Sequence, residues 1–159
     1  MTQRILIMGL PGSGKTTLAG ALKKYLEEHG DMSYGRASNE FIGDYGCKVT
    51  WLNADDIRRK YNDWDFSHEG RIRQSKRMRN LADDANADYA ICDFVAPLVE
   101  MREIFQADFT IWMDTIVQGR FADTNSVFDQ PLKFDLRIQD FNYNIDEICQ
   151  FVLNSQKAK

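Results

Sequence analysis

A glycine-rich segment near the start of the chain ends in a lysine and two threonines. Its first eight residues, Gly9-Leu10-Pro11-Gly12-Ser13-Gly14-Lys15-Thr16, match G-x-x-x-x-G-K-[ST] at every fixed position. Glycines let the backbone wrap a β-phosphate with its N–H groups pointing inward, the lysine reaches the β- and γ-phosphate oxygens, and the hydroxyl binds Mg²⁺. The pattern therefore predicts an ATP site formed by Gly9, Gly12, Ser13, Gly14, Lys15, Thr16 and Thr17.

Two carboxylates follow apolar segments farther along the chain. Asp55 comes just after Cys47–Asn53, and Asp93 closes the next apolar segment. If these segments are parallel strands, their carboxyl ends meet at the sheet edge where ligands bind. There Asp55 can orient a hydroxyl or take its proton, and Asp93 can join Thr16 in holding Mg²⁺. The alternatives are that Asp55 or Asp56 caps a helix and that Asp93 caps a turn.

Positive charge is concentrated between Arg58 and Arg79 in a chain whose net charge is −4. That stretch holds eight basic side chains against three acidic ones. A local basic block in an otherwise acidic protein indicates a small anionic ligand rather than a general nucleic-acid surface. Arg58 comes three residues after Asp55 and can hold an anionic group of that ligand. Arg73, Lys76 and Arg79 are instead typical of a solvated helix face.

Apolar runs alternate with helical patterns along the chain, which indicates βαβ units and a parallel sheet. Strands are expected over Arg4–Met8, Cys47–Asn53, Tyr89–Asp93, Phe109–Met113 and Phe134–Ile138. Helices are expected over Lys15–Glu28, Asp55–Tyr61, a segment capped by Ser67 that runs to about Asn86, Pro97–Phe105 and Asn144–Leu153. We therefore predict an α/β fold of the P-loop NTPase type, similar to nucleoside kinases, with a central parallel β-sheet flanked by helices.

The length of 159 residues suits a single domain over residues 1–159. Asp31–Gly46 shows no clear period and is expected to be an inserted connection, and Val117–Pro131 is expected to be an irregular, mobile lid or substrate loop. No apolar run approaches the length that spans a bilayer, so we expect a cytoplasmic protein with no membrane partner. Three widely spaced cysteines are expected to be free, buried thiols: Cys47, Cys92 and Cys149.

The phosphate-loop pattern alone is shared by kinases, GTPases and larger ATPases. GTPases generally carry an N-K-x-D motif that recognises the base, and this chain has none. Modules of the larger ATPases are longer than this chain. Small size with separate acidic and basic elements therefore favours a metabolite or nucleotide kinase, in which Lys15 and Asp55 are the candidate catalytic residues.

The motifs resemble those of adenylylsulfate (APS) kinases, which phosphorylate the 3′-hydroxyl of APS with ATP to give PAPS. Gly9–Leu18 is similar to the family's G-L-x-G-[SA]-G-K-[ST]-T-[LI], and Leu52–Arg58 is similar to L-D-G-D-x-[VI]-R. Phe94–Pro97 resembles F-I-S-P, and Phe121–Pro131 resembles F-T-G-I-D-S-P-Y-E-x-P. The resemblance covers most of the chain outside Asp31–Gly46.

The resemblance implies acceptor roles for residues in each matched motif. Asp55 would orient the acceptor hydroxyl, while Arg58 and Arg71 would bind the acceptor's anionic group. Phe66, in a segment similar to N-x-x-L-G-F-S, and Phe121 would form two faces of a clamp around its adenine, because purines stack on aromatic rings. The implied acceptor-binding set is Asp55, Arg58, Phe66, Arg71, Phe94 and Phe121, with Arg77 and Arg102 as further matched arginines.

The chain also departs from the family pattern, at four motif positions and in one loop. The basic lid K-G-L-Y-x-x-A is missing, since Asp114 is followed within seven residues by Phe121. Arg120 is then the cation left for a lid. The replaced positions are Asn53 for Asp, Gln74 for Asn, Ala96 for Ser and Asn125 for Asp.

These observations predict a Mg²⁺- and ATP-dependent kinase whose acceptor is a small anionic nucleotide, APS first of all. One alternative is a kinase for another nucleotide or for a polynucleotide 5′-hydroxyl, which the missing lid favours. The other is a non-catalytic nucleotide-binding protein, against which Lys15, Thr16, Asp55 and Asp93 are all present. The oligomeric state stays open, a homodimer included.

Overall fold

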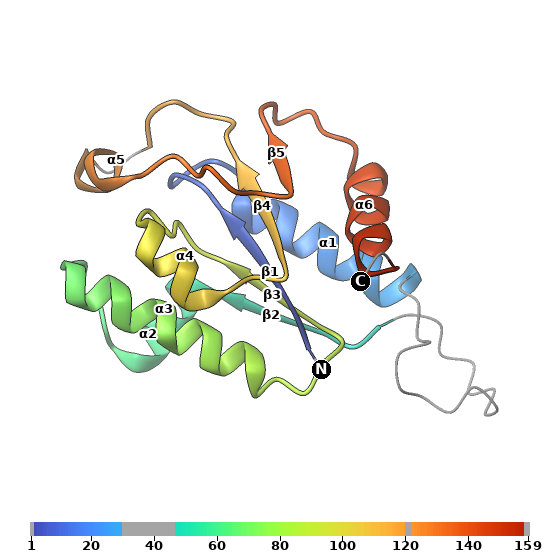
Figure 1. The fold of residues 1–159 in the computed structure, drawn as a ribbon, viewed down its shortest axis with the longest axis horizontal. Coiled ribbons are helices and arrows are strands. Elements are labelled where there is room, and N and C mark those ends of the chain that lie inside the picture. Colours follow the sequence, from blue (N-terminus) through green and yellow to red (C-terminus); the bar gives the residue numbers. More distant parts are fainter. Residues whose placement is uncertain (1, 30–46, 120–121, 158–159) are drawn as a thin grey trace.

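A computed structural model describes residues 2–29, 47–119 and 122–157, which form strands and helices in alternation (Figure 1). The strands are β1 (Gln3–Met8), β2 (Val49–Asn53), β3 (Tyr89–Asp93), β4 (Phe109–Met113) and β5 (Leu136–Ile138). The helices are α1 (Lys15–His29), α2 (Ala54–Tyr61), α3 (His68–Asp83), α4 (Val99–Phe105), α5 (Ala122–Val127) and α6 (Ile145–Lys157).

The strands form one parallel sheet in the order β2-β3-β1-β4-β5. The order reverses at β1, which pairs with β3 on one side and β4 on the other. In open parallel sheets, ligands bind outside the carboxyl ends of the strands at such a reversal. The segment that follows β1 is the predicted phosphate loop, so the topology puts that loop where the fold expects a ligand.

Two apolar clusters pack on opposite faces of the sheet and hold the helices against it. Figure 1 shows α1 and α6 on one face and α3 and α4 on the other. One joins Leu18 and Leu22 of α1 to Val152 of α6. The other joins Met78 of α3 to Phe105 of α4. The result is a three-layer α/β/α arrangement, which confirms the predicted fold class. The inner strands β3, β1 and β4 are buried over most of their length, which explains their largely apolar sequences.

Local sequence accounts for the ends of the two helices nearest the sheet edge. Asn53 caps α2, because its side-chain oxygen accepts the Asp56 N–H at 3.0 Å. The cap is therefore neither of the two aspartates that the sequence suggested. Ser67 caps α3 as predicted, with its hydroxyl accepting the Gly70 N–H at 3.2 Å. Asn62 ends α2 in the left-handed conformation, with a φ of 50°.

The chain between β4 and β5 differs most from expectation among the described residues. Val117–Pro131 was predicted to be irregular, yet it contains α5. Figure 1 shows this helix beyond the carboxyl ends of the strands, apart from both helical layers. Two hydrogen bonds join the Asn125 side chain to the backbone of Gly119, which precedes the helix, and the Asp129 N–H donates to Pro97 O at 2.7 Å. Asp31–Gly46, the predicted insertion, lies outside the described residues.

The three cysteines are free and buried, as predicted. Within the described ranges, no helix combines the length and the apolar character that crossing a membrane requires.

Candidate active site

The predicted phosphate loop connects β1 to α1. Gly12 and Gly14 have φ values of 90° and 95°, which L side chains rarely adopt, so the bend of the loop depends on glycine there. Gly9 also needs its missing side chain, because a Cβ atom would lie 2.5 Å from Met113 O. Ser13 is fully buried in the bend, and the Thr115 hydroxyl donates to Ser13 O at 2.7 Å. The loop is thereby tied to the segment after β4.

Lys15 and Thr16 open helix α1 at the end of this loop. The Lys15 Nζ donates to Leu10 O at 3.0 Å, so its ammonium group lies over the concave side of the loop. Thr16 and Thr17 are exposed on the first turn, where unpaired backbone N–H groups and the helix dipole favour anions. Their positions match those expected of residues that contact phosphate.

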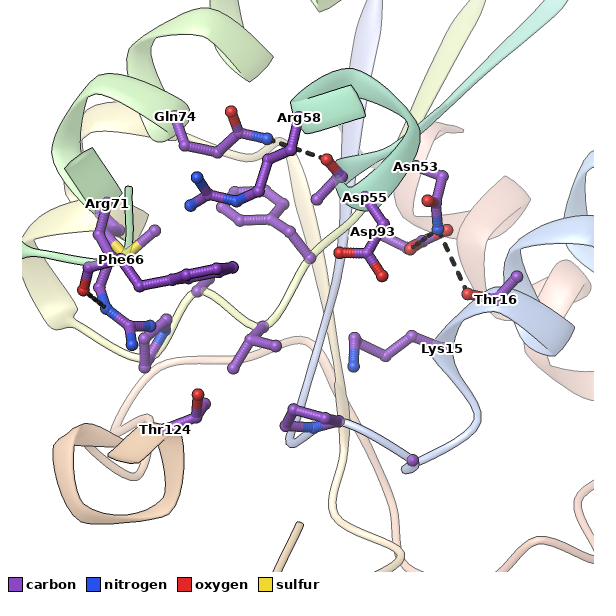
Figure 2. Close-up of a pocket in the computed structure, with 18 of the residues that line it drawn as sticks. Lys15, Thr16, Asn53, Asp55, Arg58, Phe66, Arg71, Gln74, Asp93 and Thr124 are labelled. Carbon is purple, nitrogen blue, oxygen red and sulfur yellow. Dashed lines mark hydrogen bonds between the residues drawn. The ribbon is translucent and has the colours of Figure 1, made fainter. Parts of the chain in front are cut away.

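A cavity of about 720 Å³ extends from the phosphate loop to the start of α3. This volume lies within the range of small-molecule sites. Figure 2 shows Lys15, Asp55 and Asp93 facing one another at one end, and Phe66 and Arg71 at the other. Predicted site residues that line it are Gly12, Gly14, Lys15, Thr16, Thr17, Asp55, Arg58, Phe66, Arg71, Asp93 and Phe94.

Asp93 lies at the end of β3 and is 2% exposed. Trp51 Nε1 donates to its Oδ2 at 2.6 Å, and Asn53 Nδ2 donates to its Oδ1 at 2.8 Å. Burial raises the pKa of Asp93 to about 6, although the Trp51 N–H, the Lys15 charge and the Asn53 amide all favour the ionised form. The carboxylate is therefore held in one orientation next to the phosphate loop, rather than capping a turn.

Asp55 lies in the first turn of α2, where its exposed side chain faces the cavity (Figure 2). Asn53 provides the helix cap, and Asp56 pairs with Arg59 at 2.8 Å on the outside of the helix. Helix α2 thus presents one aspartate to the cavity and one to solvent. Among the two, Asp55 is the one placed to meet an acceptor hydroxyl.

The far end of the cavity combines two buried arginines with one exposed ring. Arg58 is 5% exposed, and its guanidinium lies 4.4 Å from the centre of the Phe66 ring. The Arg71 guanidinium lies 5.6 Å from the same ring, and its Nε donates to Phe66 O at 2.9 Å. Phe66 is 51% exposed, so much of the ring remains open to a ligand. Burial lowers the pKa of Arg58, yet an arginine remains charged.

Two of the matched residues also take part in core packing or ion pairs of the fold. Phe94 is 3% exposed and packs edge-on against Phe105, so it is part of the core as well as the cavity wall. Arg77 does not line the cavity: it donates to Asp63 Oδ2 at 3.0 Å and lies over the Tyr61 ring. Phe121, the second predicted clamp residue, lies outside the described residues.

The cavity also includes residues that sequence reasoning did not assign to it. Thr124 of α5 closes one side, and Gln74 of α3 donates its amide to Ala54 O at 3.2 Å (Figure 2). Trp64 lines the mouth with 47% of its surface exposed. Its position two residues before Phe66, a predicted acceptor residue, could have indicated from sequence that Trp64 lies near the site. Thr124 had no such signal, because it reaches the cavity only through the packing of α5.

Arg102, matched as a later arginine of the family, has a bracing role at the cavity wall. Its Nε donates to Ala96 O at 2.8 Å, and its Nη2 donates to the carbonyls of Pro97 and Asp129. Ala96 has a φ of 47°, which is uncommon for a residue other than glycine. Burial lowers the pKa of Arg102 to about 10. Arg102 therefore fixes the turn after β3 to the chain after α5.

The site's oxygen donors suit Mg²⁺. Within the described ranges, no three His, Cys, Asp or Glu side chains gather as a metal cluster. Mg²⁺ in kinases needs no such cluster, because one or two protein oxygens hold it beside substrate phosphates and water. The Thr16 hydroxyl and the Asp93 carboxylate both line the cavity next to the phosphate loop, so they would be the protein oxygens that hold such an ion.

Comparison with known proteins agrees with this geometry. The sequence model of the adenylylsulphate kinase family matches residues 1–118. The chain belongs to the adenylylsulphate kinase family. It is accordingly a phosphotransferase of the kinase class, and the family implies nucleoside triphosphate binding with a divalent metal. No curated protein sequence matches the chain.

Solved structures show the fold of this adenylylsulphate kinase family member in other proteins. The Mycobacterium tuberculosis APS kinase in complex with AMPPNP and APS is 21% identical, with a TM-score of 0.70 and 98% of each chain covered. The hexameric APS kinase from Thiobacillus denitrificans is 24% identical, with a TM-score of 0.64; 99% of this chain matches 29% of that one. Shikimate kinase from Aquifex aeolicus is 13% identical, with a TM-score of 0.59, 98% of this chain covered and 97% of that one.

Proposed function

We propose that this kinase transfers the γ-phosphoryl group of ATP to the 3′-hydroxyl of adenylyl sulfate and thereby forms PAPS. One observation carries the proposal: a single cavity joins a phosphate loop to an aromatic and doubly cationic end. Lys15 and Asp55 lie at the first end, and Arg58 and Arg71 lie at the second. An acceptor that bears both a purine and an anionic group matches the second end. We place the reaction in the cytoplasm.

Lys15 and Asp55 carry the reaction in this proposal. The Lys15 ammonium stabilises negative charge on the transferred group, because a positioned cation in a partly enclosed cavity acts more strongly than one in water. Asp55 orients the acceptor hydroxyl toward the γ-phosphorus and accepts its proton as the new O–P bond forms. The exposure of Asp55 toward the cavity supports this role, since its carboxylate is not used as the cap of α2.

Arg58, Arg71 and Phe66 hold the acceptor. Guanidinium groups bind sulfate or phosphate oxygens through two parallel N–H donors, and Phe66 offers a flat face on which the adenine stacks. Both arginines lie against that ring, which keeps the anionic group and the base of the acceptor close together. Phe121 would complete the clamp from the chain before α5.

Thr16 and Asp93 would hold Mg²⁺ in this proposal. Bound there, the ion would neutralise charge on the β- and γ-phosphate oxygens. The chain's own contribution is to keep the Thr16 hydroxyl and the Asp93 carboxylate in fixed positions beside the loop.

An acceptor panel tests the proposed function. ADP release would be measured with Mg²⁺ and ATP in the presence of APS, of other nucleotides and nucleosides, and of oligonucleotides with a free 5′-hydroxyl. We expect APS to give the highest kcat/KM and the product to carry a 3′-phosphate. Preference for another nucleotide or for an oligonucleotide would assign the site to the corresponding kinase. Binding of ATP with no turnover on any acceptor would indicate a non-catalytic nucleotide-binding protein.

A further inference from the structure

The side chain of Asn53 contacts three separate parts of the site at once (Figure 2). Its Nδ2 donates to Asp93 Oδ1 at 2.8 Å and lies 3.3 Å from Thr16 Oγ1. Its Oδ1 accepts the Asp56 N–H that begins α2, at 3.0 Å. One carboxamide therefore links the start of α1, the end of β3 and the start of α2.

These contacts follow from strand register and from the chemistry of an amide. Asn53 and Asp93 are direct partners in the β2–β3 pairing, so their side chains leave the sheet edge together. A carboxamide offers both a donor and an acceptor, and each is used here. Trp51 Nε1 occupies the other Asp93 oxygen at 2.6 Å, which leaves the carboxylate a single orientation.

The family-like motif would place an aspartate at this position, and that residue could not make the same contacts. A carboxylate at position 53 could still accept the Asp56 N–H, because Asp caps helices as well as Asn does. It could not donate to Asp93, and a carboxylate at a half-buried position would face the carboxylate of Asp93, which is almost fully buried. Like charges at that range repel strongly when solvent is excluded. The amide at position 53 and the carboxylate at position 93 thus form a matched pair.

We propose that Asn53 is a positioning residue that fixes Asp93 and Thr16 for the metal and nucleotide and ties them to α2, which carries Asp55 and Arg58. The inference rests on the proposed function, because the proposed function assigns Asp93 and Thr16 to the Mg²⁺ and ATP end of the cavity. It goes beyond that function in giving a role to a residue that acts through its contacts with other residues of the site. The role requires one amide and one carboxylate at positions 53 and 93, and either position can hold either group.

Exchanging the pair tests the proposal. The variants are Asn53→Asp, Asp93→Asn and the double exchange, with Asn80→Asp, an exposed α3 position, as the charge-matched control. Binding of AMPPNP is measured at equilibrium with and without Mg²⁺, with Trp fluorescence as a second signal because Trp51 contacts Asp93. Urea unfolding of each variant reports on the fold.

We expect N53D to lose about tenfold or more of its Mg²⁺-dependent affinity. Its unfolding midpoint should fall below that of the control, because the two carboxylates repel each other in the folded state even though the α2 cap is retained. D93N should lose affinity as well. The double exchange restores one amide and one carboxylate, so it should bind Mg²⁺ and AMPPNP at least about tenfold more tightly than N53D. If N53D does not fold, a double variant that folds and binds more tightly than D93N supports the pairing.

Two results overturn the inference. One is that N53D binds AMPPNP with Mg²⁺ as tightly as N80D does. The other is that the double exchange binds AMPPNP no more tightly than the weaker of the two single variants. The same experiment separates this inference from the proposed function. A chain that shows the pairing effect but does not phosphorylate APS retains the inference and loses the proposed acceptor. A chain that phosphorylates APS without any pairing effect retains the function and loses the role of Asn53.

Discussion

Replacement of Phe66 by alanine is the sharpest test of the acceptor end. The ring lies 4.4 Å from the Arg58 guanidinium, is 51% exposed and lines the cavity, so part of it is available for a base. Stacking on an aromatic side chain contributes roughly 1–3 kcal/mol per base. Since 1.4 kcal/mol corresponds to a factor of ten, the KM for the acceptor should rise about 5- to 150-fold.

Stability should change much less than acceptor binding. A fully buried phenylalanine costs about 3–5 kcal/mol when truncated, and a half-exposed ring costs about half of that. Phe151→Ala on α6 is the matched control, because its side chain is 50% exposed and lies far from the cavity in the packing of Phe109. Both variants should therefore shift the unfolding midpoint to a similar extent.

Steady-state kinetics with each substrate varied in turn provide the measurement. In Phe66→Ala, the KM for the acceptor should rise while the KM for ATP stays near its original value. Phe151→Ala should leave both constants unchanged. Equal weakening of both substrates, or the same kinetics in the two variants, would show that Phe66 supports the fold rather than the acceptor.

Other predictions address the remaining parts of the site and the fold. Lys15→Ala should abolish transfer with little change in melting temperature, and turnover near the original rate would exclude the phosphate-loop role. Asp55→Asn should lower kcat by roughly 10²-fold with ATP affinity retained, whereas lost stability with normal specific activity would contradict the role in proton transfer. Hydrogen bonds from Ser67 and Arg73 lower the pKa of Asp65 to about 2, and Arg73 and Arg77 lower that of Asp63 still further. Because these folded-state values are depressed, the stability they contribute is full above about pH 4 and lost as pH falls toward 2. Arg73→Met should therefore flatten the loss of the urea midpoint over that interval.

Much of the fold could be predicted from sequence because its elements are locally marked. The inner strands β1, β3 and β4 are largely apolar, and Ser67 is a residue type that commonly caps a helix, as it does at the start of α3. Helix α5 could not be predicted, since Ala122–Val127 has no helical apolar period and only Ala122 is a strong helix former. Its position depends on contacts with distant residues, including the bond from the Asp129 N–H to Pro97 O.

The candidate site divides in the same way. The residues of the phosphate loop are contiguous in the chain, so its sequence pattern alone predicts the conformation of the loop. The orientation of Asp93 depends on Trp51, which is 42 residues away, and no local pattern indicates that contact. Arg77 shows the converse: it lies in a matched motif, but the structure pairs it with Asp63 outside the cavity. Sequence motifs thus identified which segments meet, and side-chain packing decided which residues face the ligand.

The basic block of α2 and α3 combines two uses of arginine that the sequence alone could not separate. Arg73 and Arg77 form ion pairs with Asp63, which braces the segment between the helices. Arg58 instead donates to the backbone oxygens of Asp63 and Asp65 and is almost completely buried at the cavity end. Carbonyl oxygens carry only partial charge. The electrostatic stabilisation that the buried Arg58 cation receives from an anionic ligand is therefore larger than that from the carbonyl groups that position it. The aspartates that neutralise the outer arginines therefore also help to keep an inner one directed at the acceptor.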